Sequence, residues 1–213
     1  ADSFLNSFGL TEKQKEGVLF WTAIRAMEYF TDPDGVTIWT EPWIAKRIVK
    51  SYKHFLERPE FKKTAEKGFL LEIGEIGFLD DLKKSQNYID FGLISGETLQ
   101  KENVIAAIQD KTLQLLDNGY GETAAKIVDV YPVRDDFLNS PQVFEKAEKG
   151  FARVVGHFPD QAMSIAREFL PPDYLDRTST RELIKETYIS RLEENLINAM
   201  EIVENFGDYL PQE

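Results

Sequence analysis

Two segments of this chain align with each other without a gap, and this internal similarity limits the fold more than any other feature of the sequence. Residues 59–69 and 141–151 share the leading proline and the run Ala-Glu-Lys-Gly-Phe. The flanks agree as well, because an Ile-Val pair and a tyrosine occur in both 48–52 and 127–131. Such self-similarity is typical of chains built from repeated supersecondary units. Two helices that converged by composition alone remain the alternative.

The shared residues predict how each copy packs. A helix opened by proline, with Gly followed by Phe near its middle, lets a neighbouring helix approach over the glycine. Glycine costs about 1 kcal/mol of helix propensity relative to alanine, so its use at both places indicates a packing demand. We therefore expect Gly68 and Gly150 to contact neighbouring helices. Gly74 and Gly156 are expected to cap the two helices at their C-terminal ends.

Helix start and stop signals recur along the whole chain, whereas strand signals are scarce. Thr11 and Gln14 form a capping-box pattern, Ser179 and Glu182 form a second one, and Ser140 is a natural N-cap. A left-handed cap at Asn118-Gly119 would end another helix. The expected helices cover 11–29, 41–58, 97–116, 121–131 and 179–206, with others starting at Pro59, Pro141 and Pro159.

These patterns predict an all-α fold of about eight or nine helices. We expect one domain over residues 1–213, arranged as an α-solenoid-like stack of helix pairs with an internal duplication. The repeat units would cover approximately residues 43–95 and 122–175. An irregular closed helical bundle that contains one duplication is the architectural alternative.

The charge balance of the 213-residue chain limits its partners. It carries 37 acidic against 25 basic residues, which gives a formal net charge of -12. Such a charge repels phosphate backbones and anionic lipid headgroups, so nucleic acid and membrane surfaces are disfavoured as partners. No uninterrupted apolar run approaches the ~18 residues that a membrane span needs.

Cysteine is absent from the sequence, which excludes disulfides, thiol nucleophiles and cysteine-ligated metal centres. The chain begins at Ala1 without an initiator methionine, as a fragment or a processed form would. Either origin is compatible with the cell interior, a periplasm or secretion, so the compartment stays open.

Residues that carry chemistry are few. The two histidines, His54 and His157, stand alone in their segments, so an HExxH zinc motif and a Ser/His/Asp grouping are missing. No phosphate-binding loop motif occurs either. Carboxylates gather within 72–81 and at Asp135-Asp136, which is the ordinary pattern of solvated helix ends. We expect no cofactor and no metal, and enzyme activity stays open, with a non-enzymatic role favoured.

One segment between two expected helices suggests a calcium loop. Residues 32–35 read Asp-Pro-Asp-Gly, and Glu41 follows at the offset of the bidentate glutamate of an EF-hand. The register fails twice, because the first ligand position would be Phe30 and the position for an apolar residue holds Thr37. A Pro-Asp-Gly turn before an N-capped helix is favoured. A calcium-responsive protein remains a weaker alternative.

The three tryptophans gather around the same segment. Trp21 and Trp43 lie on periodic apolar faces and are expected in the core, whereas Trp39 belongs to a loop, where a tryptophan often anchors a partner. Acidic residues beside this loop suit a ligand that is basic and partly apolar. The predicted partner-binding residues are Trp39, Glu41, Trp43, Asp32 and Asp34.

These expectations favour a non-enzymatic helical-repeat module with an acidic surface that binds a protein or peptide, preferably of basic character. The alternative is an all-α enzyme or small-ligand binder whose pocket is lined by aromatic side chains and carboxylates. The shape of the surface separates the two hypotheses. A continuous open face supports the first, and one deep pocket with converging Asp, Glu and Trp side chains supports the second.

Overall fold

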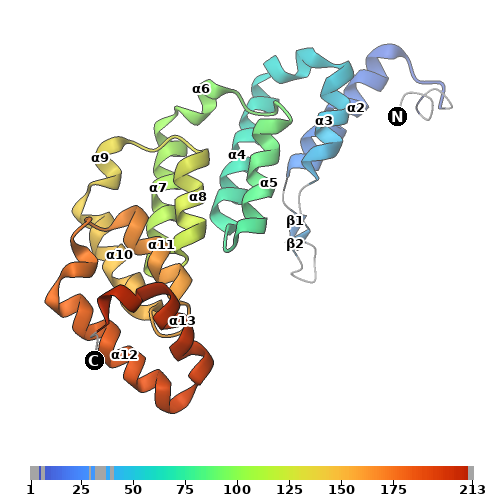
Figure 1. Ribbon diagram of the computed structural model, residues 1–213. Helices are drawn as coiled ribbons and strands as arrows, with labels where there is room; N and C mark the ends of the chain where they lie inside the picture. Colours follow the sequence, from blue (N-terminus) through green and yellow to red (C-terminus); the bar gives the residue numbers. More distant parts are fainter. Residues whose placement is uncertain (1–4, 6–7, 29, 32–36, 39–40, 211–213) are drawn as a thin grey trace. The chain divides into compact units, whose positions relative to one another are not determined.

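The protein is all-α. The computed structural model describes residues 5, 8–28, 30–31, 37–38 and 41–210. Within these residues it contains twelve α-helices, three short 3-10 helices and one antiparallel pair of two-residue strands (Figure 1). The chain divides into two compact units. One is made of residues 1–75 and 80–101, and the other of residues 76–79 and 102–213.

The first unit contains two helix pairs. Its elements in chain order are α2 (Glu12–Met27), β1 (Phe30–Thr31), β2 (Thr37–Ile38), α3 (Pro42–Ser51), η1 (Lys53–Glu57), α4 (Pro59–Glu75), α5 (Leu79–Asp90) and α6 (Gly96–Leu99). The strands pair with Phe30 opposite Ile38 and Thr31 opposite Thr37. Helix α2 packs on both α3 and α4. The rings of Phe69 and Tyr88 join α4 to α5, with centroids 6.4 Å apart.

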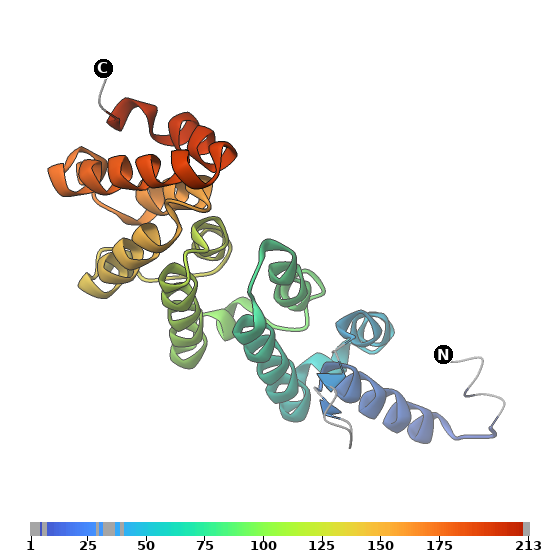
Figure 2. The same ribbon diagram turned by 90° about the horizontal axis from the view of Figure 1, so that it is seen from below.

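The second unit arranges its helices in two rows. Its elements are α7 (Glu102–Asp117), α8 (Gly121–Val130), α9 (Asp135–Leu138), α10 (Pro141–Val154), α11 (Pro159–Phe169), η2 (Tyr174–Asp176), α12 (Thr178–Glu194), α13 (Leu196–Phe206) and η3 (Gly207–Tyr209). Helices α7 and α10 pack together in one row, and α8, α11 and α13 follow one another in the other (Figures 1 and 2). No helix among the described residues is long and apolar enough to cross a membrane.

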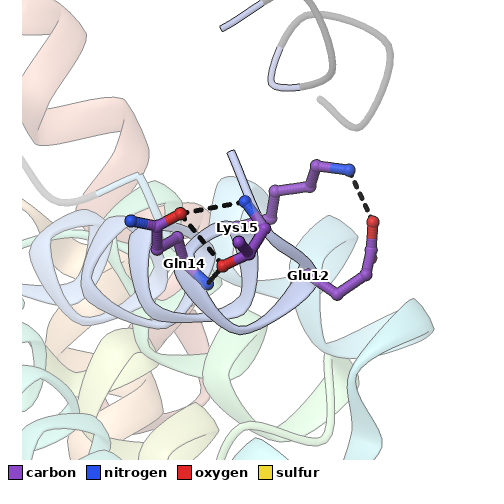
Figure 3. Close-up of polar contacts among 4 residues, drawn as sticks. Glu12, Gln14 and Lys15 are labelled. Atoms are coloured by element: carbon purple, nitrogen blue, oxygen red, sulfur yellow. Dashed lines mark hydrogen bonds and ion pairs between the residues drawn. The ribbon is translucent and has the colours of Figure 1, made fainter. Parts of the chain in front are cut away.

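Local signals set several helix ends as expected. Thr11 and Gln14 form the capping box that opens α2, and Figure 3 shows the Gln14 side chain turned back toward the start of the helix beside the Glu12–Lys15 ion pair. The Ser140 hydroxyl accepts a hydrogen bond from the Val143 amide at 3.4 Å. Gly119 follows α7 with a φ of 84°, the left-handed conformation that glycine adopts without steric cost.

Other expected helix ends are wrong. The Ser179 capping box does not form, because α12 already begins at Thr178 and its N-cap residue, Arg177, makes no side-chain capping bond. Gly74 lies inside α4, and neither Gly74 nor Gly156 has the positive φ of a left-handed cap. A glycine therefore marks a helix end only where the backbone turns left-handed, which the sequence does not determine.

The number of helices is higher than the predicted eight or nine because two expected helices are interrupted, and because α5 and the single turn α9 were not among the helices that the sequence signals located. The predicted 97–116 helix breaks after α6, where the amides of Gln100 and Lys101 each bond a carbonyl three residues back at 3.2 Å. The predicted 179–206 helix breaks at Asn195, whose side chain accepts from the Ile197 amide at 3.0 Å and starts α13. Asparagine in mid-helix thus acts as a new N-cap.

Gly68 and Gly150 both lie against a neighbouring helix, as predicted. A β-carbon on Gly68 would stand 2.7 Å from the carbonyl oxygen of Met27, the last residue of α2. On Gly150 it would overlap the carbonyl oxygen of Leu116, in the last turn of α7. In both units a long helix therefore lays its C-terminal turn directly on the glycine of another helix.

The same positions of α4 and α10 face the core. In six pairs of residues that lie 82 positions apart in the sequence, both members are buried, and all of them except Val155, the C-cap residue of α10, lie within the two helices. The pairs are Phe61 and Val143, Ala65 and Ala147, Gly68 and Gly150, Phe69 and Phe151, Glu72 and Val154, and Ile73 and Val155. In the second unit Phe151 meets Tyr174 and Phe206 edge to face, with ring centroids 5.3 and 5.8 Å apart.

Candidate functional site

The predicted partner-binding residues divide into two groups. Trp39, Asp32 and Asp34 lie outside the described residues. Glu41 is exposed directly before α3, where its amide donates a hydrogen bond to the Ala26 carbonyl at 2.8 Å and its side chain makes no capping bond. Trp43 is the second residue of α3.

Trp21 and Trp43 are not core residues, so that part of the sequence prediction is wrong. Trp21 is 60% exposed and Trp43 is 48% exposed. Each helix turns a different apolar stripe inward. The residues that α2 buries are Leu19, Phe20, Ala23, Ile24 and Met27. Because α2 carries a second apolar stripe through Val18 and Trp21, periodicity alone could not identify the stripe that packs inward.

A groove runs between α2 and α3 on the first unit. Its cavity of about 380 Å³ is lined by Leu19, Thr22, Trp43, Ile44, Arg47, Ile48, Ser51 and Tyr52. A second hollow of about 700 Å³ follows the outer side of α2 and is lined by Leu10, Gln14, Gly17, Val18, Trp21, Thr22 and Arg25. Thr22 lines both, so the two hollows adjoin. We call this combined surface the α2–α3 groove.

The charges on α3 make this groove cationic. Helix α3 carries Lys46, Arg47 and Lys50 and no acidic residue. Trp43, Arg47 and Lys50 follow one another at i, i+4 and i+7, so they share one face of the helix. Neither Arg47 nor Lys50 forms an ion pair with any residue that the structure describes. An exposed tryptophan therefore shares a helix face with two cations that have no ion-pair partner among the described residues, in a chain whose net charge is -12.

Aromatic packing holds the floor of the groove in place. The Tyr52 ring stacks on Phe55 with centroids 5.3 Å apart, and Phe55 meets Phe20 edge to face at 5.1 Å. Arg58 lies over the Phe20 ring at 4.5 Å from its centroid. Phe20 and Phe55 are both buried. Because these rings come from α2 and η1, they fix the position of the α3 end that carries Tyr52.

The two histidines have hydrogen-bond partners from distant segments. His54 Nε2 lies 2.8 Å from Glu16 Oε1, which also accepts a hydrogen bond from Arg58 Nη2 at 3.0 Å. His157 Nε2 lies 2.7 Å from Arg191 Nη2. The first contact joins η1 to α2, and the second joins the turn after α10 to α12, which is a structural role.

Carboxylates do not gather around the groove in the described part of the chain. Glu72, the first residue of the acidic cluster predicted on helix ends, is buried within α4, whereas Glu75 and Asp80 are exposed. Within the described ranges, no group of three or more His, Asp or Glu side chains is placed to hold a metal ion. The calcium loop between residues 32 and 41 was the weaker alternative to a simple turn, and of its carboxylate ligand candidates Glu41 alone has a described position.

Comparisons with known proteins supply no family. The chain matches no protein-family model, no curated protein and no solved structure.

Proposed function

We propose that this protein is a non-enzymatic helical-repeat module, and that the α2–α3 groove binds an extended or helical segment of a partner protein. The observation that carries the proposal is the exposure of Trp43 on a hollowed surface that it shares with Arg47, which has no ion-pair partner among the described residues. Tryptophan and arginine are the side chains most enriched where a few residues supply most of the binding energy. A preformed groove also lowers the ordering cost of binding.

The helix pattern supports a repeat of the α-solenoid kind. The order α2, α3, η1, α4, α5, α6 has a counterpart in α7, α8, α9, α10, α11, η2. Helices α2 and α7 both have 16 residues, and α3 and α8 both have 10. A long helix, a shorter one and a single turn then follow once more as α12, α13 and η3. We propose that the duplication predicted at 43–95 and 122–175 extends to include α2 and α7.

The chemistry of the groove indicates an acidic, partly apolar partner. A guanidinium binds carboxylates with two parallel hydrogen bonds, and tryptophan offers a large apolar face beside it. The partner's charge is therefore expected to be negative, whereas Asp32, Asp34 and Glu41 led us to expect a basic partner. The first two lie outside the described residues, and Glu41 is not among the described residues that line the groove. The described residues therefore favour an acidic partner at this place.

A small-ligand pocket is the second hypothesis. The cavity of about 380 Å³ falls within the size range of ligand sites. This hypothesis expected Asp, Glu and Trp side chains to converge on the pocket. Among the described lining residues, the polar side chains beside Trp43 include Arg47, Thr22 and Ser51 but no carboxylate. Such a set can bind an anion through hydrogen bonds but offers no carboxylate for proton transfer. The cavity volume is the one property that favours a small ligand. The charge of Arg47 and the exposure of Trp43 favour a protein partner more strongly.

Selection from a random phage-displayed peptide library tests the proposal. The wild-type chain should enrich peptides that combine Asp or Glu with aliphatic or aromatic residues, because only these match both features of the groove. The variants Trp43→Ala and Arg47→Gln should lose this enrichment. Arg167→Gln is the matched control, since it removes one exposed arginine from α11. Enrichment of basic peptides, or equal enrichment by all variants, would contradict the proposal.

A further inference from the structure

Helix α13 carries two apolar stripes, and one of them is exposed. The buried stripe consists of Ala199, Ile202 and Phe206. The exposed stripe follows i, i+4 and i+7 through Leu196, Met200 and Val203, which are 62%, 57% and 44% exposed. A helix that is apolar on more than one side is ordinarily covered on each of those sides. The exposed stripe of α13 is therefore a surface suited to contact another protein segment.

Neighbouring side chains enlarge this surface. Ile197 is exposed next to Leu196, and the end of α12 adds the exposed Ile189 and Leu192. These six residues fall within positions 189–203, so a large share of the exposed large apolar side chains of the described chain lies on one helix hairpin. Single exposed apolar residues need no explanation, but a cluster of this kind marks an interaction surface.

The charge beside the exposed stripe is negative. Helix α13 contains Glu201 and Glu204 and no basic residue. Glu193 and Glu194 end α12, and Glu194 is already paired with Arg191. Neither Glu201 nor Glu204 has an ion-pair partner among the residues that the structure describes. An aliphatic stripe beside exposed carboxylates is the kind of segment that the α2–α3 groove is expected to bind.

We propose that the exposed stripe of α13 occupies the α2–α3 groove of a second copy of this chain. Leu196, Met200 and Val203 would cover the apolar faces of Trp21 and Trp43. Glu201 and Glu204 would lie close to Arg47 and Lys50, so opposite charges would face each other across the contact. This inference rests on the function proposed for the groove and names its partner.

Charge favours a contact of groove with stripe over a contact between two like surfaces. A contact of stripe with stripe would set α13 against its own copy and bring Glu201 and Glu204 next to like charges. A contact of groove with groove would bring Arg47 next to Arg47. Like charges placed opposite one another cost free energy, whereas groove against stripe pairs opposite charges. Each copy has one groove and one stripe, so two copies can exchange this contact reciprocally or further copies can add in a row.

Sedimentation velocity over a wide range of concentration tests the inference. The wild-type chain should show a weight-average mass that rises with concentration and falls when salt is added, because screening weakens the paired charges. Arg47→Glu reverses a groove charge, and Met200→Glu places a carboxylate in the stripe. Both side chains are exposed, so each variant should fold, and each alone should sediment as a monomer. Phe158→Glu, which changes another exposed apolar residue, should behave as the wild type does.

A mixture of the two variants gives the sharpest outcome. The Arg47→Glu chain keeps its stripe and the Met200→Glu chain keeps its groove, so an equimolar mixture should form a one-to-one pair and grow no further. Association of Arg47→Glu by itself would show stripe meeting stripe and would overturn the inference. A wild-type chain that stays monomeric would overturn it too. The proposed function would survive either result if the groove still selects acidic peptides in a Trp43-dependent manner.

Discussion

The first and last helix pairs, α2–α3 and α12–α13, both expose an apolar stripe, but the charges beside the two stripes have opposite signs. Each pair buries one apolar stripe and exposes a second. On α2–α3 the exposed side chains are tryptophans beside basic residues, and on α12–α13 they are aliphatic residues beside glutamates. The net charge of -12 describes the whole chain but not either surface. The sign of a partner's charge therefore has to be derived from the local surface.

The largest expected effect separates the two stripes of α13. Phe206→Ala removes a fully buried ring that meets Phe151, so it should lower the free energy of unfolding by about 3–5 kcal/mol. Met200→Ala truncates a side chain on the exposed stripe and should change it by less than about 0.5 kcal/mol. Urea unfolding of both variants measures the difference. Equal losses would mean that the exposed stripe is part of the core.

The two glycines test how firmly α2 and α7 are held by the helices beneath them. Gly150→Leu should cost about 3 kcal/mol, because its new side chain would meet the backbone of Leu116. Gly68→Leu should cost about 1–2 kcal/mol, because the Tyr88 hydroxyl is the end of a side chain and can move aside, although the Met27 carbonyl cannot. Urea unfolding measures both values.

The control for these variants is Gly17, an interior glycine of α2 with no neighbouring atom within 4 Å of a built β-carbon. Gly17→Ala should raise the free energy of unfolding by about 0.5–1 kcal/mol, since alanine favours the helix. Neutral outcomes at Gly68 and Gly150 would contradict the close helix crossings and remove the main support for a structural repeat.

A smaller effect separates binding from stability in the groove. Trp43→Ala should weaken binding of a peptide selected by the wild-type chain by about 1–2 kcal/mol, the range of a modest hot spot. Its melting temperature should stay close to the wild-type value, because Trp43 is half exposed. Fluorescence anisotropy of a labelled peptide and thermal unfolding followed by circular dichroism give the two quantities. Loss of stability without loss of affinity would assign Trp43 to the fold.

The smallest expected effect is a loss of stability at alkaline pH through Tyr174, which lies in η2 directly before the last helix pair. Burial raises the pKa of Tyr174 above its ordinary value of 10.0, and the negative charge of Glu148 adds to the shift. The unfolded chain therefore loses this proton first, so stability is fully present below about pH 10 and declines as the pH rises further. Tyr174→Phe should show a shallower decline in melting temperature between pH 9 and 11, a range set by that ordinary pKa. An unchanged slope would contradict the shift.

Short-range signals predicted the fold well where they act on the backbone nearby. Thr11, Ser140 and Gly119 set helix ends as expected, because a cap needs only the next few residues. The capping box predicted at Ser179 does not form, because α12 already begins at Thr178. The N-cap at Asn195 was not predicted, because an asparagine caps a helix only where the chain leaves the preceding helix. Close packing at Gly68 and Gly150 was predictable because the motif occurs twice.

The candidate site was harder to predict because exposure and ion pairing are tertiary properties. Trp21 lies on a regular apolar stripe, but α2 has two of them and the sequence does not rank them. Arg58 forms an ion pair with Glu16, which lies 42 residues earlier in the sequence, whereas Arg47 has no ion-pair partner among the described residues. No spacing rule distinguishes the two arginines. The one available signal was the absence of acidic residues from 42–51 in an otherwise acidic chain.

Ionic quenching of tryptophan fluorescence tests most directly whether exposed tryptophans stand in a cationic groove on this acidic protein. A Trp39→Phe background leaves Trp21 and Trp43 as the emitting residues. Iodide should quench this emission more strongly than caesium at equal ionic strength, despite the net charge of -12, and Arg47→Gln should reduce the iodide effect. Stronger quenching by caesium, or no response to Arg47→Gln, would contradict the account.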